Sequence, residues 1–122
     1  MAQTVVKVLG WVFLVIGILG FVPGITADGD MLLGVFEVNA AHNIVHLLTG
    51  ILALVFARSA SQARTFAMVF GIIYAIIALL GFFTGDVLGF VVANGADNWL
   101  HVLLAIIFLW AGFAGRKSTA AV

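Results

Sequence analysis

The chain has 122 residues, of which 65% are hydrophobic and only 8% are charged, and its formal net charge is zero. Soluble domains carry about 25% charged residues, so this chain is too poor in charge to cover a water-exposed surface, and lipid is its natural solvent. The zero net charge argues against nucleic acid as a partner. Since cysteine is absent, disulfides and cysteine metal ligands are excluded too. We expect one transmembrane domain, residues 1–122.

Four apolar stretches predict four membrane-spanning helices, at about residues 5–22, 39–57, 65–83 and 94–114. A helix rises ~1.5 Å per residue, so about 20 residues cross a hydrocarbon core of ~30 Å. The first and third stretches are long enough by themselves. The second and fourth reach this length when they begin at Asn39 and Asn94. We expect both to be N-caps, because an asparagine oxygen accepts a hydrogen bond from an otherwise unpaired backbone N–H.

The charged residues divide between the two ends of these helices. The cationic residues lie on one side: Lys7, Arg58, Arg64, Arg116 and Lys117. The acidic residues lie on the other: Asp28, Asp30, Glu37, Asp86 and Asp97. By the positive-inside rule this pattern predicts that both termini and the loop between the second and third helices are cytoplasmic.

The second half of the chain repeats the first. Residues 7–24 align without gaps with residues 68–85, and residues 33–46 align at a second offset with residues 88–101. The most telling matches are Gly20/Gly81, Asn39/Asn94, Asn43/Asn98 and His46/His101. General apolar similarity explains paired Val, Ile and Leu, but it does not explain Asn, Asn and His at identical spacing.

We therefore infer a tandem duplication of a helical hairpin, with repeat one at residues 5–57 and repeat two at residues 65–114. Both repeats enter the membrane from the same side, so the predicted fold is an all-α four-helix bundle with a pseudo-two-fold axis along the membrane normal. Residues 31–38 and 87–93 are apolar but too short to span. We expect them to cap the outer end of the bundle, extended or as a partial helical turn.

A polar face begins each second helix. In the first repeat it holds Asn39, His42, Asn43 and His46, at positions i, i+3, i+4 and i+7. In the second repeat it holds Asn94, Asp97, Asn98 and His101. The pseudo-two-fold axis predicts that these faces meet inside the bundle, where polar side chains in membrane proteins usually pair with one another.

Three interpretations of this cluster stay open. The first is structural: the asparagines cap helices and the other side chains form interhelical hydrogen bonds. The second is a ligand site, in which His42, His46, Asp97 and His101 hold zinc, iron or copper, or His46 and His101 act as axial haem ligands. The third is a proton or solute path, although only Thr49 and Tyr74 offer polar groups deeper in the bundle.

No phosphate-binding loop or catalytic serine motif is present in the sequence, so we expect no enzyme. The leading functional hypothesis is a membrane protein that packs through small-residue helix faces, with itself or as an accessory subunit of a larger complex. These faces include Gly10, Gly17, Gly50 and Gly71. The alternative is a metal- or haem-binding redox protein that uses the histidine cluster.

The segment LGVFEVNAAHNIVHLLTG, residues 33–50, resembles the signature of DUF4383, a family of uncharacterised bacterial four-helix membrane proteins. Its most specific part is Asn43-Ile44-Val45-His46-Leu47 followed by Gly50, and Asn94, Asn98 and His101 echo it later in the chain. The resemblance implies a multi-pass protein of the bacterial inner membrane. It implies no activity.

Overall fold

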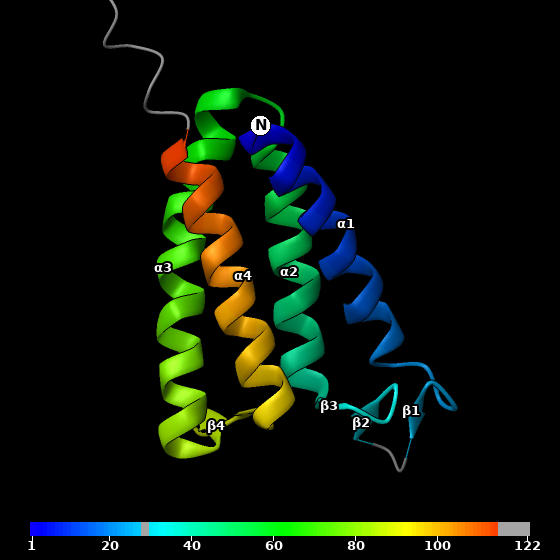
Figure 1. Cartoon of the computed structure of the whole chain (residues 1–122). Helices are drawn as coiled ribbons and strands as arrows, with labels where there is room; N and C mark the ends of the chain where they lie inside the picture. The colour runs from blue at the N-terminus through cyan, green and yellow to red at the C-terminus, as the bar shows by residue number, and fades with distance from the viewer. Residues whose placement is uncertain (28–29, 115–122) are drawn as a thin grey trace, which may run out of the picture.

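The computed structural model describes residues 1–27 and 30–114, which form four helices with two small sheets at one end (Figure 1). The helices are α1 (Ala2–Leu19), α2 (Ala40–Phe56), α3 (Ala60–Thr84) and α4 (Gly95–Ala114). The all-helical class and the number of helices are confirmed in this part of the chain. Three charged residues used to predict the orientation, Asp28, Arg116 and Lys117, lie outside the described residues.

Three helix boundaries differ from the prediction by three residues or more. The first helix begins at Ala2 rather than near residue 5 and ends at Leu19 rather than near residue 22. Pro23 disfavours helical backbone at Val22. The third helix begins at Ala60 rather than near residue 65, because the Ser59 hydroxyl caps it by accepting from the Gln62 N–H at 3.2 Å. Hydropathy alone missed this polar first turn.

Apolar helices indicate a membrane protein. Three of them, α1, α3 and α4, are long and apolar enough to cross a membrane, whereas α2 has 17 residues and is shorter. Large apolar side chains on all four helices point outward, among them Val15, Leu48, Leu79 and Ile106. An outward apolar surface of this extent suits lipid better than water.

Consecutive helices pack in pairs, α1 along α2 and α3 along α4. Glycine allows the backbones to touch. A Cβ added at Gly50 would lie 2.8 Å from the Gly10 carbonyl oxygen and 2.9 Å from the Leu14 nitrogen. In the second pair, a Cβ at Gly71 would lie 3.0 Å from the Leu109 nitrogen. Small residues at helix contacts are the usual means of close packing in membranes.

Aromatic rings join the two pairs of helices. Phe13 of α1 lies 5.5 Å from Tyr74 of α3 and stacks on Phe108 of α4 at 6.3 Å, measured between ring centroids. Phe66 meets Phe108 edge-on at 5.9 Å. All four rings are buried, so the core of the bundle is aromatic and lies between the hairpins.

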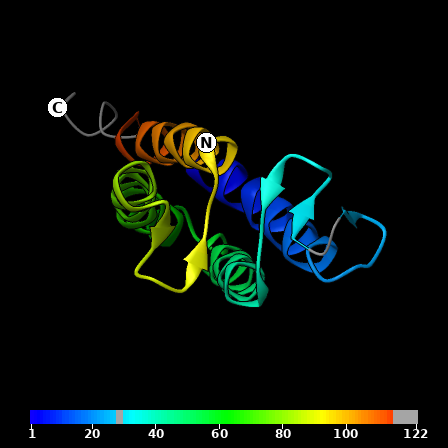
Figure 2. The same ribbon diagram turned by 90° about the horizontal axis from the view of Figure 1, so that it is seen from below.

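Short antiparallel sheets cover one end of the bundle (Figure 2). One contains β1 (Thr26–Ala27), β2 (Met31–Leu32) and β3 (Phe36–Glu37), and the other contains β4 (Asp86–Val87) and β5 (Val91–Val92). The outer segments are thus extended, one of the two predicted conformations. Strand β3 lies against α4 and β5 against α2, so the β2–β3 hairpin reaches over α4 and the β4–β5 hairpin reaches over α2.

Both β2–β3 and β4–β5 use the same unusual turn. Leu33 and Gly34 have φ angles of 55° and 70°, and Leu88 and Gly89 have φ angles of 56° and 79°. Positive φ is rare for a residue with a bulky side chain. The paired Leu-Gly positions of the sequence therefore adopt the same backbone geometry in both halves.

Candidate functional site

The polar face of α2 is fixed by a helix cap. The Asn39 side-chain oxygen accepts from the His42 backbone N–H at 2.8 Å, which starts the helix where the sequence predicts. The i, i+3 and i+4 spacings then turn His42, Asn43 and His46 to one side. That side is the interior of the bundle, where these side chains are 1%, 2% and 5% exposed.

Helix α4 begins with a reciprocal cap. The Asn94 side-chain oxygen accepts from the Asp97 N–H, and Asp97 Oδ2 accepts from the Asn94 N–H, both at 3.0 Å. This is the geometry of a capping box. It directs Asp97, Asn98 and His101 into the bundle, where all three are buried.

The two capping asparagines also bond to the β-hairpins: Asn39 bonds to the β4–β5 hairpin and Asn94 to the β2–β3 hairpin. Asn39 Nδ2 donates to the Phe90 carbonyl in the turn between β4 and β5, at 2.8 Å. Asn94 Nδ2 donates to the Val35 carbonyl in the turn between β2 and β3, also at 2.8 Å. Equivalent residues thus make equivalent bonds across the bundle, and the two polar faces are brought together.

Three imidazoles meet where the faces join. The Nε2 atoms of His42 and His46 are 3.2 Å apart, and the His42 and His101 ring centroids are 6.0 Å apart. One ligand atom from each of the three histidines lies within 4.8 Å of the others. Two of them come from α2 and the third from α4, so both repeats contribute.

A backbone contact sets the tautomer of His42. Its Nδ1 lies 3.1 Å from the Glu37 carbonyl oxygen, which can only accept. The proton therefore resides on Nδ1, and the lone pair of Nε2 faces the cluster. Histidines that ligate metals are commonly oriented by such a bond from the other ring nitrogen.

Asp97 lies beside the cluster and is not one of the three converging side chains. Its Oδ2 accepts from the Glu37 N–H as well as from the Asn94 N–H, both at 3.0 Å. Strand β3 is thus fixed through Glu37 by His42 of one repeat and Asp97 of the other. The carboxylate is also close enough to interact electrostatically with His42.

Four polar atoms at the site lack hydrogen-bond partners among the described residues. They are Asn43 Oδ1, Asn98 Oδ1, His46 Nδ1 and His101 Nδ1. Each asparagine lies against a glycine, Asn43 against Gly20 at the C-cap of α1 and Asn98 against Gly81 of α3, where a Cβ would overlap its amide. An unpaired buried polar group costs about 1–3 kcal/mol, so this arrangement is expensive and is repeated in both halves.

Aromatic rings line the deeper side of the cluster. Phe13 packs against His46 and Tyr74 packs against His101, each with ring centroids 5.5 Å apart. The Tyr74 hydroxyl bonds to Thr49 one turn deeper in α2. Phe13 is an apolar residue on a different helix from the histidines, so spacing along the chain does not mark it as a site residue, although the alignment of the two halves pairs it with Tyr74.

A cavity of about 360 Å³ adjoins all three histidines. Residues from α2, α3, the β4–β5 hairpin and α4 line it, and its walls are almost wholly apolar. The histidines and Tyr74 supply its polar side chains. A pocket of this size with a few convergent polar groups is the usual form of a small-molecule site.

The chain was also compared with known proteins. The model of the family described as Domain of unknown function (DUF4383) matches residues 3–114. The chain belongs to the DUF4383 family. No curated protein and no solved structure matches the DUF4383 chain.

Proposed function

We propose that this DUF4383 protein is a four-span membrane protein that binds one divalent transition-metal ion through His42, His46 and His101. The observation that carries the proposal is the convergence of three buried imidazoles, with one ligand atom from each inside 4.8 Å. Imidazole is a ligand for zinc, copper, iron and nickel, and three histidines with one open position form a recognised class of zinc site.

The distance between the first two ligands fits such an ion. Nitrogens ~2.0–2.1 Å from a tetrahedral Zn²⁺ lie about 3.3–3.4 Å apart, and the Nε2 atoms of His42 and His46 are 3.2 Å apart. The bond from His42 Nδ1 to the Glu37 carbonyl holds one lone pair in place. The ligand atom of His101 lies within 4.8 Å of the other two.

Hydrogen bonds within the protein satisfy the cluster only in part. Nε2 of His46 lies within hydrogen-bond distance of Nε2 of His42, at 3.2 Å, but Nδ1 of His46 and Nδ1 of His101 have no partner among the described residues. A buried polar group without a partner calls for an explanation, and an ion or water bound at the site is one such explanation. Metal binding accounts for why three histidines are kept at this depth.

The geometry supports a bare ion better than haem. A haem needs a flat slot between its two axial imidazoles, His46 and His101. The His42 ring lies 4.4 Å from His46 and 6.0 Å from His101, so it occupies space beside both. A metal ion needs no such slot.

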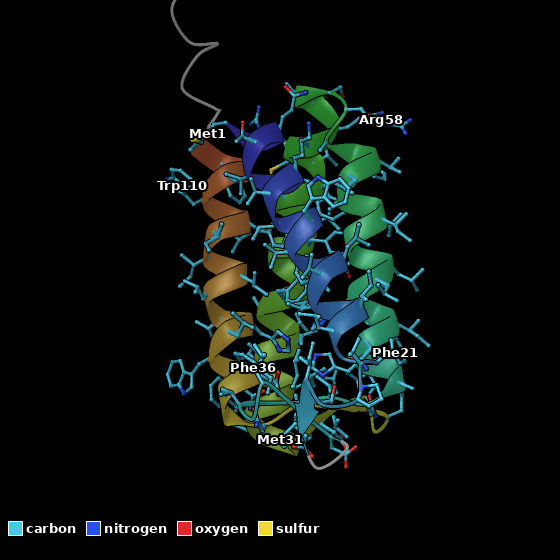
Figure 3. All side chains as sticks on the ribbon, turned by 90° about the vertical axis from the view of Figure 1, so that its right-hand side faces the viewer. Met1, Phe21, Met31, Phe36, Arg58 and Trp110 are labelled. Carbon is cyan, nitrogen blue, oxygen red and sulfur yellow. The ribbon has the colours of Figure 1, made fainter. Side chains whose placement is uncertain are left out.

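Our proposed orientation keeps both termini and the α2–α3 loop in the cytoplasm of a bacterial inner membrane. Lys7, Arg58 and Arg64 are on the side that the positive-inside rule assigns to the cytoplasm. Met1 and Arg58 lie at one end of the bundle, and Met31 and Phe36 lie at the other (Figure 3). The metal site then faces the outer half of the membrane.

Self-association or an accessory role stays a prediction with less support. It was motivated by small-residue helix faces, but Gly10, Gly17, Gly50 and Gly71 pack against neighbouring helices of the same chain. These contacts leave fewer small-residue surfaces for a second copy. The repeated caps, turns and glycine contacts support the proposed tandem duplication.

Metal content tests the proposal directly. We expect protein purified in a mild detergent to bind one Zn²⁺ per chain, measured by elemental analysis and by titration against a chelator. His42→Gln, His46→Gln and His101→Gln should each weaken binding at least tenfold. Thr49→Val is the matched control, because Thr49 is a buried polar residue of the same helix that is outside the cluster.

Acidification should release the ion, because ligating imidazoles must be neutral and protons compete for their lone pairs. Unchanged affinity in all three histidine variants would contradict the proposal. So would wild-type protein that stays free of metal after loading.

A further inference from the structure

The cavity beside the histidines lies between the two repeats. His42 and His46 come from α2 and His101 from α4, while Ile73, Ile76 and Ile77 of α3 and the β4–β5 hairpin form the facing wall. Figure 2 shows this hairpin extending from the end of α3 towards α2. The cavity therefore lies where the helical hairpin α1–α2 meets the helical hairpin α3–α4, and the three histidines form part of its lining.

Its open side faces lipid. Ile76 is 51% exposed and Leu88 is 73% exposed, and both belong to the cavity wall. Ile76 is in the longest apolar helix of the chain. A molecule can thus enter sideways from the bilayer without passing through water, which suits a ligand with a hydrocarbon body.

Charge identifies the group that such a ligand presents to the ion. Three neutral imidazoles supply no negative charge to a divalent ion. The carboxylates of Asp97 and Glu37 are close enough to interact with each other beside the site, but no acidic residue in the described part of the chain lines the cavity where the fourth ligand would bind. An uncompensated charge in a low-dielectric interior is strongly unfavourable, so the fourth ligand should be an anion.

We propose that the cavity binds a fatty acid from the bilayer, with its carboxylate on the metal ion and its chain along the apolar wall. This inference rests on the proposed metal site. Moving a hydrocarbon chain from lipid into an apolar cavity changes its surroundings little, so the carboxylate–metal bond supplies the affinity. The cavity walls supply the selectivity for a single chain.

Cobalt provides a spectroscopic test, because Co²⁺ can replace Zn²⁺ and its visible absorption reports its ligands. Dodecanoic acid is titrated into Co²⁺-loaded protein in lipid nanodiscs. We expect a spectral change that saturates at one acid per chain. Dodecan-1-ol and methyl dodecanoate, which have the same chain without the charge, should leave the spectrum unchanged.

Ile77→Trp separates the cavity from the metal site. Ile77 is half-buried and lines the cavity, so the larger side chain should weaken acid binding at least tenfold while Co²⁺ content stays at one per chain. Ile72→Trp is the matched control, since Ile72 is 53% exposed on the same helix and is not in the wall. Ile77→Phe is a milder version should the tryptophan variant misfold.

The outcomes distinguish the two proposals. If Co²⁺ binds but the acid leaves its spectrum unchanged, or the alcohol acts equally well, the fatty-acid inference is overturned and the metal site stands. Equal acid binding by Ile77→Trp and wild type also overturns it. If wild-type protein binds no Co²⁺ or Zn²⁺, the proposed function fails and the inference fails with it.

Discussion

Asp97 and His42 occupy aligned positions in the two halves of the sequence but make different hydrogen bonds. His42 donates through Nδ1 to the Glu37 carbonyl, whereas Asp97 accepts from the Glu37 N–H. The backbone N–H and C=O of Glu37 are thus both hydrogen-bonded, one to a side chain from each half of the chain. The difference between histidine and aspartate makes the site asymmetric within a symmetric frame.

Asp97→Asn tests whether Asp97 positions the site or ligates the ion. We expect a loss of about 1–3 kcal/mol in the free energy of unfolding, because a charged acceptor of two backbone N–H groups is replaced by a neutral one. Thermal unfolding monitored by circular dichroism measures the loss. Metal stoichiometry should stay at one ion per chain. Loss of the ion in this variant would instead make Asp97 a ligand, as the sequence spacing first suggested.

At the scale of elements, close contact between helix backbones depends on glycine, whose side chain is a single hydrogen atom. Gly50 of α2 faces the backbone of α1 at Gly10 and Leu14, so neither neighbour can move aside independently. The caps at Asn39 and Asn94 act at the first turns of α2 and α4. Packing and capping together set the tilt at which the histidines meet.

Gly50→Ala should destabilise the protein by about 1–3 kcal/mol, the usual cost of overpacking, because its Cβ would press on the α1 backbone. Gly95→Ala is the matched control. Gly95 is also helical but has nothing within 4 Å of an added Cβ, and alanine favours helix over glycine. Equal unfolding midpoints for the two variants would contradict the packing argument.

Asn39 has two roles that substitution can separate. Asn39→Ala removes both the cap of α2 and the bond to Phe90, and should cost about 0.5–2 kcal/mol for the cap alone. Asn39→Asp keeps an acceptor for the His42 N–H but loses the donor to the Phe90 carbonyl. We therefore expect its unfolding midpoint to lie between those of wild type and Asn39→Ala. A midpoint equal to that of Asn39→Ala would mean that the cap contributes nothing.

Across the whole molecule, much of the fold follows from the sequence. The helices start at Asn39 and Asn94 because capping is local chemistry, and the repeat spacing predicts that the polar faces meet. The start of α3 was missed because its first turn is polar. The cavity was also missed, because it depends on how Ile77 and the β4–β5 hairpin pack against α2, and spacing along the chain carries no such information.

Because the proposed ligands come from both hairpins, an ion should tie the whole bundle together. Zn²⁺ at one hundred times its Kd should stabilise the fold by about 2.7 kcal/mol. Thermal unfolding with and without Zn²⁺ measures this effect. At the same Zn²⁺ concentration a tenfold weaker site stabilises by about 1.4 kcal/mol, so His101→Gln should lose about half of the shift or more, since it removes the ligand supplied by α4. A shift in His101→Gln as large as that of wild type would show that Zn²⁺ binds elsewhere.

The proposed orientation can be tested with single cysteines, because the natural chain has none. Ser61→Cys places a thiol at the exposed start of α3, and Asp30→Cys places one at the exposed opposite end. In intact bacteria, a membrane-impermeant maleimide should label the Asp30→Cys protein alone. Labelling of Ser61→Cys alone would reverse the orientation.

The crossed bonds from Asn39 and Asn94 have a consequence for how such a protein can be assembled. Each hairpin carries an asparagine donor and a turn carbonyl that it does not use on itself, at Asn39 and Val35 in one and at Asn94 and Phe90 in the other. In an isolated helical hairpin, the asparagine amide and the turn carbonyl would both lack these hydrogen-bond partners. A second copy related by a two-fold rotation would supply a partner for each. The hydrogen-bonding pattern inside this one chain is therefore that of a two-fold dimer of half-length proteins.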